Sequence, residues 1–387
     1  MKRVPYGRQQ ISREDIQAVT KVLEGDWLTQ GPLIGKFEEE FARYVGAKYA
    51  VALSNGTVAL HLASICAGLG HGDILWTSPI SFVASANAGL YCGADVDFVD
   101  IEPGTANMSV SMLEEKLKTA KNNGKLPKVI IPVHFAGQSC DMEKVGALSK
   151  EYGFTVIEDA CHASGGTYKG EKVGSCGYSS MAVFSFHPVK IITTGEGGMI
   201  CTNDAEIYKR LLRLRTHGIT RDEAFMEGAS EGGWYYEMVE LGMNCRITDF
   251  QCALGLSQLS RIDQFVARRN ELASRYDKEL QGLPLSHLDK SDDAYSAYHL
   301  YVIRLDLEKC GKTRREVYDA LIERGVLANV HYIPIHLQPL YRKMGFKKGD
   351  FPNAEKYYEE ALTIPLYPSM TDNDFEQVVE SLREAVA

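Results

Sequence analysis

A lysine that could do covalent chemistry stands at position 190, at the end of the segment FSFHPVK and just before the glycine-rich turn TTGEGG at 193–198. An ε-amine attacks a carbonyl group only when burial or a neighbouring positive charge lowers its pKa. Position alone favours a different interpretation, a surface lysine in a loop, because lysine side chains are overwhelmingly exposed. Lys190 is therefore a candidate for covalent chemistry only if other residues of such a site can be placed near it.

Asp159 is the first residue that supports Lys190. It follows the apolar run FTVIE at 154–158, so it stands at the carboxyl end of an expected strand, where ligands of open α/β sheets bind. A second expected strand at 181–186 lies between Asp159 and Lys190, and both side chains can reach one pocket. A carboxylate placed there suits pyridoxal 5'-phosphate (PLP), whose ring withdraws electrons from the substrate only when its nitrogen is protonated. The alternative for Asp159 is a helix N-cap.

A phosphate site is predicted at the turn SNGT, residues 54–57, between an expected strand and an expected helix. Helix N-termini carry unsatisfied N–H groups and the positive end of the helix dipole, and both features bind phosphate. Gly56 and Thr57 would supply these N–H groups. The Ser185 hydroxyl is a candidate second ligand; its alternative is a core-facing serine bonded to the backbone.

Other classes of function find little support. The sequence contains no G-x-x-x-x-G-K-[ST], H-E-x-x-H or G-x-S-x-G motif, and His331 and His336 are poorly spaced for a metal, so we expect no metal site. The net charge is -9 with scattered Lys and Arg, which argues against nucleic-acid binding. Nine cysteines without a C-x-x-C pair indicate reduced thiols. No signal peptide or membrane span is recognisable, and we expect a cytoplasmic protein.

Short apolar runs that alternate with helical stretches predict the architecture. The runs that we interpret as buried strands are 49–53, 95–100, 128–135, 154–158 and 181–186. One face of the helix after the first strand carries Val58, Leu62, Ile65 and Leu69. This alternation is typical of an α/β fold with a mostly parallel sheet and helices on both faces.

Two capping patterns predict helix starts. Ser12 is followed by Asp15 and by apolar residues at helical spacing (Ile16, Val19, Leu23), and Thr248 with Gln251 opens a long helix to about residue 280. The remainder predicts a strand at 297–305, a helix from Thr313, a strand at 327–333 and two terminal helices, a compact α+β unit. We place the boundary near residue 255, with a large domain at 1–255 and a small domain at 256–387.

Taken together, these residues resemble the DegT/DnrJ sugar aminotransferases, PLP enzymes of the aspartate aminotransferase fold (PLP fold type I). The likeness covers essentially the whole chain and is most specific in EDACH at 158–162, SFHPVK at 185–190 and LGMNCR at 241–246. The family implies a large domain with a mostly parallel mixed sheet and a smaller C-terminal α+β domain. Cys161 and Ile191 depart from the more familiar pattern.

The resemblance also implies roles for individual residues. Lys190 would be the Schiff-base lysine and Asp159 the partner of the ring nitrogen, with His162 beside the ring and bonded to Asp159 or to the ring hydroxyl. The other implied cofactor contacts are the phosphate ligands Gly56, Thr57 and Ser185, the stacking ring of Phe82, and Asn244, which would reach the phosphate of a neighbouring subunit. That last role implies a homodimer with shared active sites. Without the resemblance, Phe82 reads as core and Asn244 as a loop cap.

The likeness is closest to one branch, the C4 aminotransferases of pseudaminic acid biosynthesis, through FSFHPVK at 184–190, LRTHGI at 214–219 and VHYIPIH at 330–336. It implies amino transfer from L-glutamate, which leaves as 2-oxoglutarate, through the pyridoxamine form of PLP to the C4 ketone of a UDP-linked 4-keto-6-deoxy-N-acetyl sugar. The implied substrate contacts are Tyr6, Trp27, Thr29, His217 and His331. The alternatives are a dTDP- or GDP-linked 4-keto-6-deoxyhexose, a PLP-dependent sugar dehydratase, in which histidine replaces the lysine, and a PLP-binding regulator.

Overall fold

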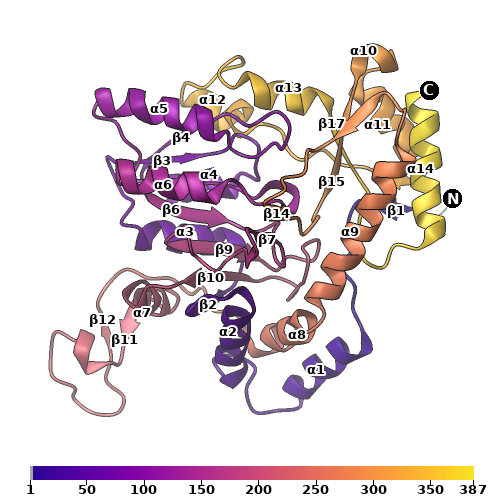
Figure 1. Cartoon of the computed structure of the whole chain (residues 1–387). Helices are drawn as coiled ribbons and strands as arrows, with labels where there is room; N and C mark the ends of the chain where they lie inside the picture. The colour runs from indigo at the N-terminus through magenta and orange to yellow at the C-terminus, as the bar shows by residue number, and fades with distance from the viewer. Residues whose placement is uncertain (1–2) are drawn as a thin grey trace.

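A seven-stranded sheet forms the centre of the structure, a computed structural model that describes residues 3–387 (Figure 1). Its strand order is β2-β10-β9-β6-β5-β3-β4. The strands are β2 (Tyr49–Leu53), β10 (Gly198–Thr202), β9 (Met181–Ser185), β6 (Thr155–Asp159), β5 (Val129–Ile131), β3 (Ile74–Thr77) and β4 (Asp95–Phe98). Only β10 runs antiparallel to its neighbours. The predicted mostly parallel sheet is confirmed, although β3 and β10 were not among the predicted strands.

Alternation along the strands explains why helices cover both faces. Val51 and Leu53 of β2 belong to one buried cluster, whereas Ala50 and Ala52 belong to another on the opposite face, as the two-residue period of a strand requires. The first face is covered by α3 (Gly56–Cys66), α4 (Ala84–Tyr91) and α7 (Ala205–Leu214), and the opposite face by α2 (Pro32–Val45), α5 (Val110–Asn122), α6 (Met142–Tyr152) and α8 (Asp249–Leu259).

The predicted helix from Thr248 to about residue 280 is two helices, α8 and α9 (Ile262–Glu279). Thr248 and Gln251 form the expected capping box. The backbone leaves helical geometry at Arg261, with φ -118° and ψ 5°. There the Arg261 guanidinium bonds the carboxylate of Asp15 in α1 (Arg13–Leu23), which packs on α8. This long-range contact accompanies the break. No glycine or proline lies between α8 and α9 to mark the break in the sequence.

A second unit follows, on the right of Figure 1. The antiparallel strands β13 (Leu285–His287), β15 (Tyr301–Leu305) and β17 (Ala361–Ile364) pack with α9, α11 (Arg314–Glu323) and α14 (Asp372–Val386). The predicted strand at 327–333 is wrong beyond its first residue, because β16 is only Val326–Leu327, paired with β1 (Val4–Pro5). The domain boundary near residue 255 stays a prediction; it falls inside α8.

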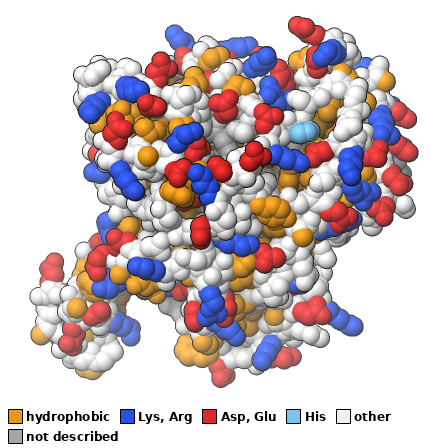
Figure 2. All heavy atoms as spheres, in the orientation of Figure 1, with side chains coloured by type: hydrophobic (Ala, Val, Ile, Leu, Met, Phe, Trp, Pro, Cys, Tyr) orange, Lys and Arg blue, Asp and Glu red, His pale blue; other side chains and the backbone are white. Residues whose placement is uncertain are grey.

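The remaining elements are short. They are β7 (Thr167–Tyr168), β8 (Glu171–Lys172), β11 (Ile219–Thr220), β12 (Glu237–Met238), β14 (Ala294–Tyr295), α10 (Leu307–Cys310), α12 (Pro339–Lys343), α13 (Pro352–Glu360), and three 3-10 turns at Phe135–Gly137, Glu223–Phe225 and Ile335–Leu337. The β11–β12 hairpin projects from the body at the lower left of Figures 1 and 2. Within residues 3–387, no helix is long and apolar enough to cross a membrane.

Candidate active site

Lys190 lies in the loop between β9 and β10, where its backbone N–H donates to the carbonyl oxygen of His187 at 2.9 Å. Its side chain is partly buried. Burial lowers the pKa of the Lys190 amine, while the neighbouring Cys161 and Asp159 act in the opposite direction. The surface-loop interpretation is therefore wrong, and the amine has the lowered pKa that covalent chemistry requires.

Asp159 is the last residue of β6, and its side chain is buried. Pairing of Asp159 with Val183 places it beside the strand that leads to Lys190. One carboxylate oxygen accepts from the Ser85 hydroxyl at 2.6 Å and the other from the backbone N–H of Cys161 at 3.2 Å. No helix follows Asp159, since residues 160–166 form turns, so the N-cap alternative is wrong.

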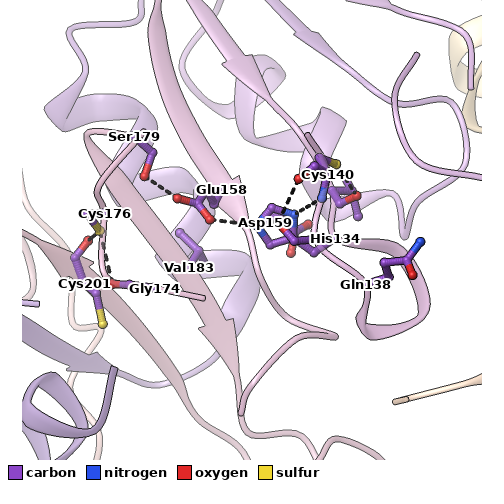
Figure 3. Close-up of polar contacts among 12 residues, drawn as sticks. His134, Gln138, Cys140, Glu158, Asp159, Gly174, Cys176, Ser179, Val183 and Cys201 are labelled. Atoms are coloured by element: carbon purple, nitrogen blue, oxygen red, sulfur yellow. Dashed lines mark hydrogen bonds and ion pairs between the residues drawn. The ribbon is translucent and has the colours of Figure 1, made fainter. Parts of the chain in front are cut away.

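The opposite face of β6 is held by Glu158. Successive strand residues point to opposite faces, and Glu158 bonds His134 Nε2 at 2.7 Å and the Ser179 hydroxyl at 2.5 Å (Figure 3). Nδ1 of His134 accepts the backbone N–H of Cys140 at 3.2 Å, which leaves Nε2–H as the donor to Glu158. Both partners of this contact are buried. These contacts therefore hold the carboxyl end of β6 from the face opposite the Asp159 side chain.

The predicted phosphate turn and Ser185 lie together. Asn55 caps α3, accepting the Val58 backbone N–H at 2.9 Å, so Gly56 and Thr57 open the helix. A Cβ atom on Gly56 would lie 3.0 Å from the Cβ of Ser185 and 3.5 Å from the Sγ of Cys161. Glycine therefore allows the helix N-terminus to approach Ser185 closely, and the Ser185 hydroxyl also accepts the His187 N–H at 3.4 Å.

His162 completes the inner wall, with a hydrogen-bond partner that we did not expect. Its Nε2 lies 3.2 Å from the Tyr332 hydroxyl, whereas the bonds on Asp159 come from Ser85 and Cys161. Its Nδ1 is buried without a partner among the described residues. Burial, with a contribution from Lys190, lowers the pKa of His162 well below its usual value, so the ring is neutral with one nitrogen available to a ligand.

Phe82 stands at the rim of this site. Its ring centroid is 6.3 Å from that of Tyr332, and its side chain is 57% exposed. An exposed aromatic ring beside a buried lysine and carboxylate is suited to cover a planar ligand. The interpretation of Phe82 as core is therefore wrong.

The predicted substrate contacts fall into two groups. Tyr6 and His331 lie together on the inner side, with ring centroids 5.1 Å apart, and the Nδ1 of His331 bonds the Thr363 hydroxyl at 2.8 Å. Burial, aided by Lys190, lowers the pKa of His331 to about 3. His331 is thus neutral and can offer a hydrogen bond, but not a positive charge, to a substrate.

The second group lies around the N-terminus of α8 and the base of the β11–β12 hairpin. Thr29 forms a bridge with Thr248, and Trp27 precedes it with 59% of its side chain exposed. His217 and Asn244 lie in adjacent segments, where the His217 N–H donates to the Met243 carbonyl at 2.9 Å. Within residues 3–387, no hydrogen bond or ion pair joins these residues to Lys190 or Asp159.

Three residues of the site were missed from the sequence. Ser85 bonds Asp159, Tyr332 bonds His162, and the ring of His299 lies 4.4 Å from that of His162. The Lys190 charge contributes to lowering the pKa of His299, after burial, which places that ring in the same pocket. Tyr332 and His299 fall inside the strands expected at 327–333 and 297–305, but such positions alone carry no functional signal.

The residues present fit PLP. A buried carboxylate meets the need of the ring nitrogen, the unpartnered Nδ1 of His162 can bond a ring substituent, and the N-terminus of α3 at Gly56, close to the Ser185 hydroxyl, suits a phosphate. Lys190 carries the amine that the aldehyde would meet. No group of three or more His, Cys, Asp or Glu in the described part of the chain is arranged to hold a metal ion.

Known proteins are similar in sequence over nearly the whole chain. The chain is 42% identical over 386 residues to the spore coat polysaccharide biosynthesis protein SpsC of Bacillus subtilis (99% of this chain, 97% of the relative). It is 37% identical over 381 residues to a UDP-4-amino-4,6-dideoxy-N-acetyl-beta-L-altrosamine transaminase of Campylobacter jejuni (98% and 96% covered). The predicted likeness to the pseudaminic acid branch is confirmed.

Solved structures agree. The aminotransferase PseC of Helicobacter pylori, involved in the biosynthesis of pseudoaminic acid, superposes with a TM-score of 0.90 at 30% identity and covers 100% of this chain and 99% of its own. The PLP form of the putative sugar aminotransferase Spr1654 of Streptococcus pneumoniae gives 0.88 at 29% identity, with 99% and 98% covered. The predicted PLP fold type I is confirmed. The family pattern described as the DegT/DnrJ/EryC1/StrS aminotransferase family matches residues 9–383, and this chain belongs to that family.

Proposed function

We propose that this enzyme transfers the amino group of L-glutamate, by means of PLP and its pyridoxamine form, to the C4 ketone of a UDP-linked 4-keto-6-deoxy-N-acetyl hexose. The single observation that carries this proposal is the likeness to two Campylobacter jejuni enzymes named for that transamination, at 37% and 38% identity over 98% and 97% of this chain. The fold of PseC and the grouping of Lys190, Asp159 and His162 in one pocket support it.

The chain's own residues account for the chemistry. When bound, PLP withdraws electrons from the carbon that gains or loses the amino group. The Lys190 amine, with its lowered pKa, is neutral in a larger fraction of molecules and can accept or return a proton at that carbon. Asp159 would hold the ring nitrogen, Phe82 would cover the ring face, and Gly56, Thr57 and Ser185 would bind the phosphate.

Recognition of the sugar nucleotide is assigned to the outer residues. Tyr6 and the neutral His331 offer hydrogen bonds at the inner side, and Trp27, Thr29 and His217 lie farther out. Because His331 carries no charge, the diphosphate needs a cation from elsewhere, either an arginine of this chain or a residue of a second subunit.

We further propose a homodimer with shared active sites. In the single chain, large apolar side chains of two regions face solvent. They are Ile16, Leu23, Trp27 and Leu28 on and after α1, and Trp234, Tyr236, Met238 and Leu241 on the projecting hairpin, with exposures of 48% to 85%. Apolar surface of this extent is typical of a protein interface. The hairpin's base carries Asn244, whose predicted contact is the partner's cofactor phosphate.

The substrate proposal is tested by comparing kcat/KM for the UDP-linked N-acetyl sugar with those for dTDP- and GDP-linked 4-keto-6-deoxyhexoses at fixed glutamate. Loss of a buried polar contact to the acetamido group should cost about 1–3 kcal/mol, or about 5- to 150-fold in kcat/KM. Equal or better turnover of a dTDP- or GDP-linked sugar would overturn the assignment of the sugar and leave the reaction type standing.

A further inference from the structure

Ser85 makes a contact with Asp159 that the proposed chemistry has not yet used. It lies in the first turn of α4 and is fully buried. Its Oγ is 2.6 Å from the Oδ2 of Asp159, a residue on β6, and 2.7 Å from the Oγ of Ser81. The carbonyl oxygen of Phe82, at 3.4 Å, is a more distant acceptor. A buried hydroxyl therefore stands directly on the carboxylate that would face the ring nitrogen.

The direction of these hydrogen bonds follows from counting protons. An ionised carboxylate only accepts, and a serine hydroxyl has one proton to donate. The proton of Ser85 therefore goes to Asp159, at a distance typical of a hydroxyl bonded to a carboxylate. Ser85 can then only accept from Ser81, which is itself 3% exposed. The result is a chain of donors from Ser81 to Ser85 to Asp159.

This chain has a geometric consequence for the carboxylate. Oδ2 is held by Ser85 and Oδ1 by the backbone N–H of Cys161. With one protein donor on each oxygen, the carboxylate cannot rotate, and its remaining lone pairs have fixed directions. Residues 81–85 also carry Phe82, so one short segment holds both the ring that would cover the cofactor and the group that would face its nitrogen.

We propose that Ser85, supported by Ser81, is a positioning residue that orients the Asp159 carboxylate toward the protonated nitrogen of the cofactor ring. This inference rests on the proposed use of PLP. Removing a residue that hydrogen-bonds to a metal ligand commonly lowers the affinity for the metal by about 10- to 100-fold, and we expect the same scale for a residue that holds a cofactor ligand. Ser85→Ala should therefore weaken PLP binding by about 10-fold or more, and Ser81→Ala should have a smaller effect of the same sign.

The test measures equilibrium dissociation constants rather than turnover, for PLP and for its 1-deaza analogue, in which carbon replaces the ring nitrogen. Ser64→Ala is the matched control, since Ser64 is also a fully buried helical serine and its hydroxyl donates to the Leu60 carbonyl at 2.8 Å, away from Asp159. We expect Ser85→Ala to lose affinity for PLP but to bind the deaza analogue within about 2-fold of the unmodified chain, and Ser64→Ala to change neither affinity.

The outcomes of these binding measurements distinguish a failure of the proposed function from a failure of the role of Ser85. If the unmodified chain does not bind PLP, the proposed function fails. If it binds PLP and Ser85→Ala binds equally well, the role of Ser85 alone is wrong. Equal losses for PLP and the deaza analogue would also overturn this role, because they would show a general defect of the pocket. Thermal midpoints of Ser85→Ala and Ser64→Ala, compared without cofactor, report the cost of losing a buried hydroxyl in each helix.

Discussion

Replacing Asp159 by asparagine removes the charge of the site with little change in shape. The side chain is 6% exposed, so bulk water does not screen its interaction with a ring cation. Hydrogen bonds to charged groups contribute about 1.5–3 kcal/mol, against about 0.5–1.5 kcal/mol for neutral pairs. The amide also reverses one contact, because an NH2 group placed at Oδ2 donates to Ser85 and leaves the Ser85 proton to find another acceptor.

The weaker hydrogen bond costs about 1–1.5 kcal/mol and the unsatisfied buried Ser85 proton about 1–3 kcal/mol, so together they come to about 3 kcal/mol, a loss of about 100-fold or more in turnover. The assay is the rate of 2-oxoglutarate formation from L-glutamate at saturating PLP and keto-sugar. The matched control is Asp100→Asn, since Asp100 is also buried but accepts backbone N–H groups of Asn353 and Ala354. Asp100→Asn should reduce stability and leave turnover within about 3-fold. If the turnover of Asp159→Asn also stayed within about 3-fold of that of the unmodified chain, the role of Asp159 would be structural only.

Three further changes test other parts of the account. Lys190→Ala should remove the visible absorbance of lysine-bound PLP and nearly all turnover while the chain still folds; a borohydride-trappable lysine adduct with a normal rate would show that another lysine is used. Mixing Lys190→Ala with Asn244→Ala chains should restore activity through heterodimers that contain one intact site, whereas an active monomer in sedimentation would exclude a shared site. In α1, burial raises the pKa of Asp15, but bonds from Ser257, Ser12, Arg261 and Gln258 outweigh it and lower the pKa overall. Asp15 therefore stabilises the fold above about pH 4 and loses that effect as the pH falls through its folded-state pKa. The difference in thermal midpoint between the unmodified chain and Asp15→Asn should consequently disappear in acid. A difference that is constant with pH would contradict this.

The central sheet was predictable because its signal is local. Strands buried on both faces are nearly continuous apolar runs, and β2, β6 and β9 stand at the expected places, as does the edge strand β4, whose residues alternate between polar and apolar. The sequence from 252 to 266 shows apolar residues at helical spacing across Ser260 and Arg261, so nothing local marks the end of α8. The extended segment after β16 was also misread, because it pairs with β17 only at one isolated bridge, between Asn329 and Thr363, and does not continue as a strand.

The site was predictable only where residue type restricts the chemistry. Lys190 and Asp159 came from their types and their places after strands, and the structure brings them into one pocket. Ser85 could not be predicted, because a serine in a helix is usually bonded to its own backbone, and the contact with Asp159 joins residues 74 positions apart. The charge state of His331 could not be predicted from the sequence, because its burial is a property of the folded chain and makes it neutral.

Transfer of isotope from donor to product tests the central claim most directly. The enzyme is incubated with L-[15N]glutamate and the UDP-linked 4-keto-6-deoxy-N-acetyl sugar, and the sugar nucleotide is analysed by NMR and mass spectrometry. Our account predicts 15N bonded to C4 of the sugar and one equivalent of 2-oxoglutarate for each product molecule. Recovery of the keto-sugar without 15N, from a chain that has bound PLP and releases 2-oxoglutarate from glutamate, would contradict it.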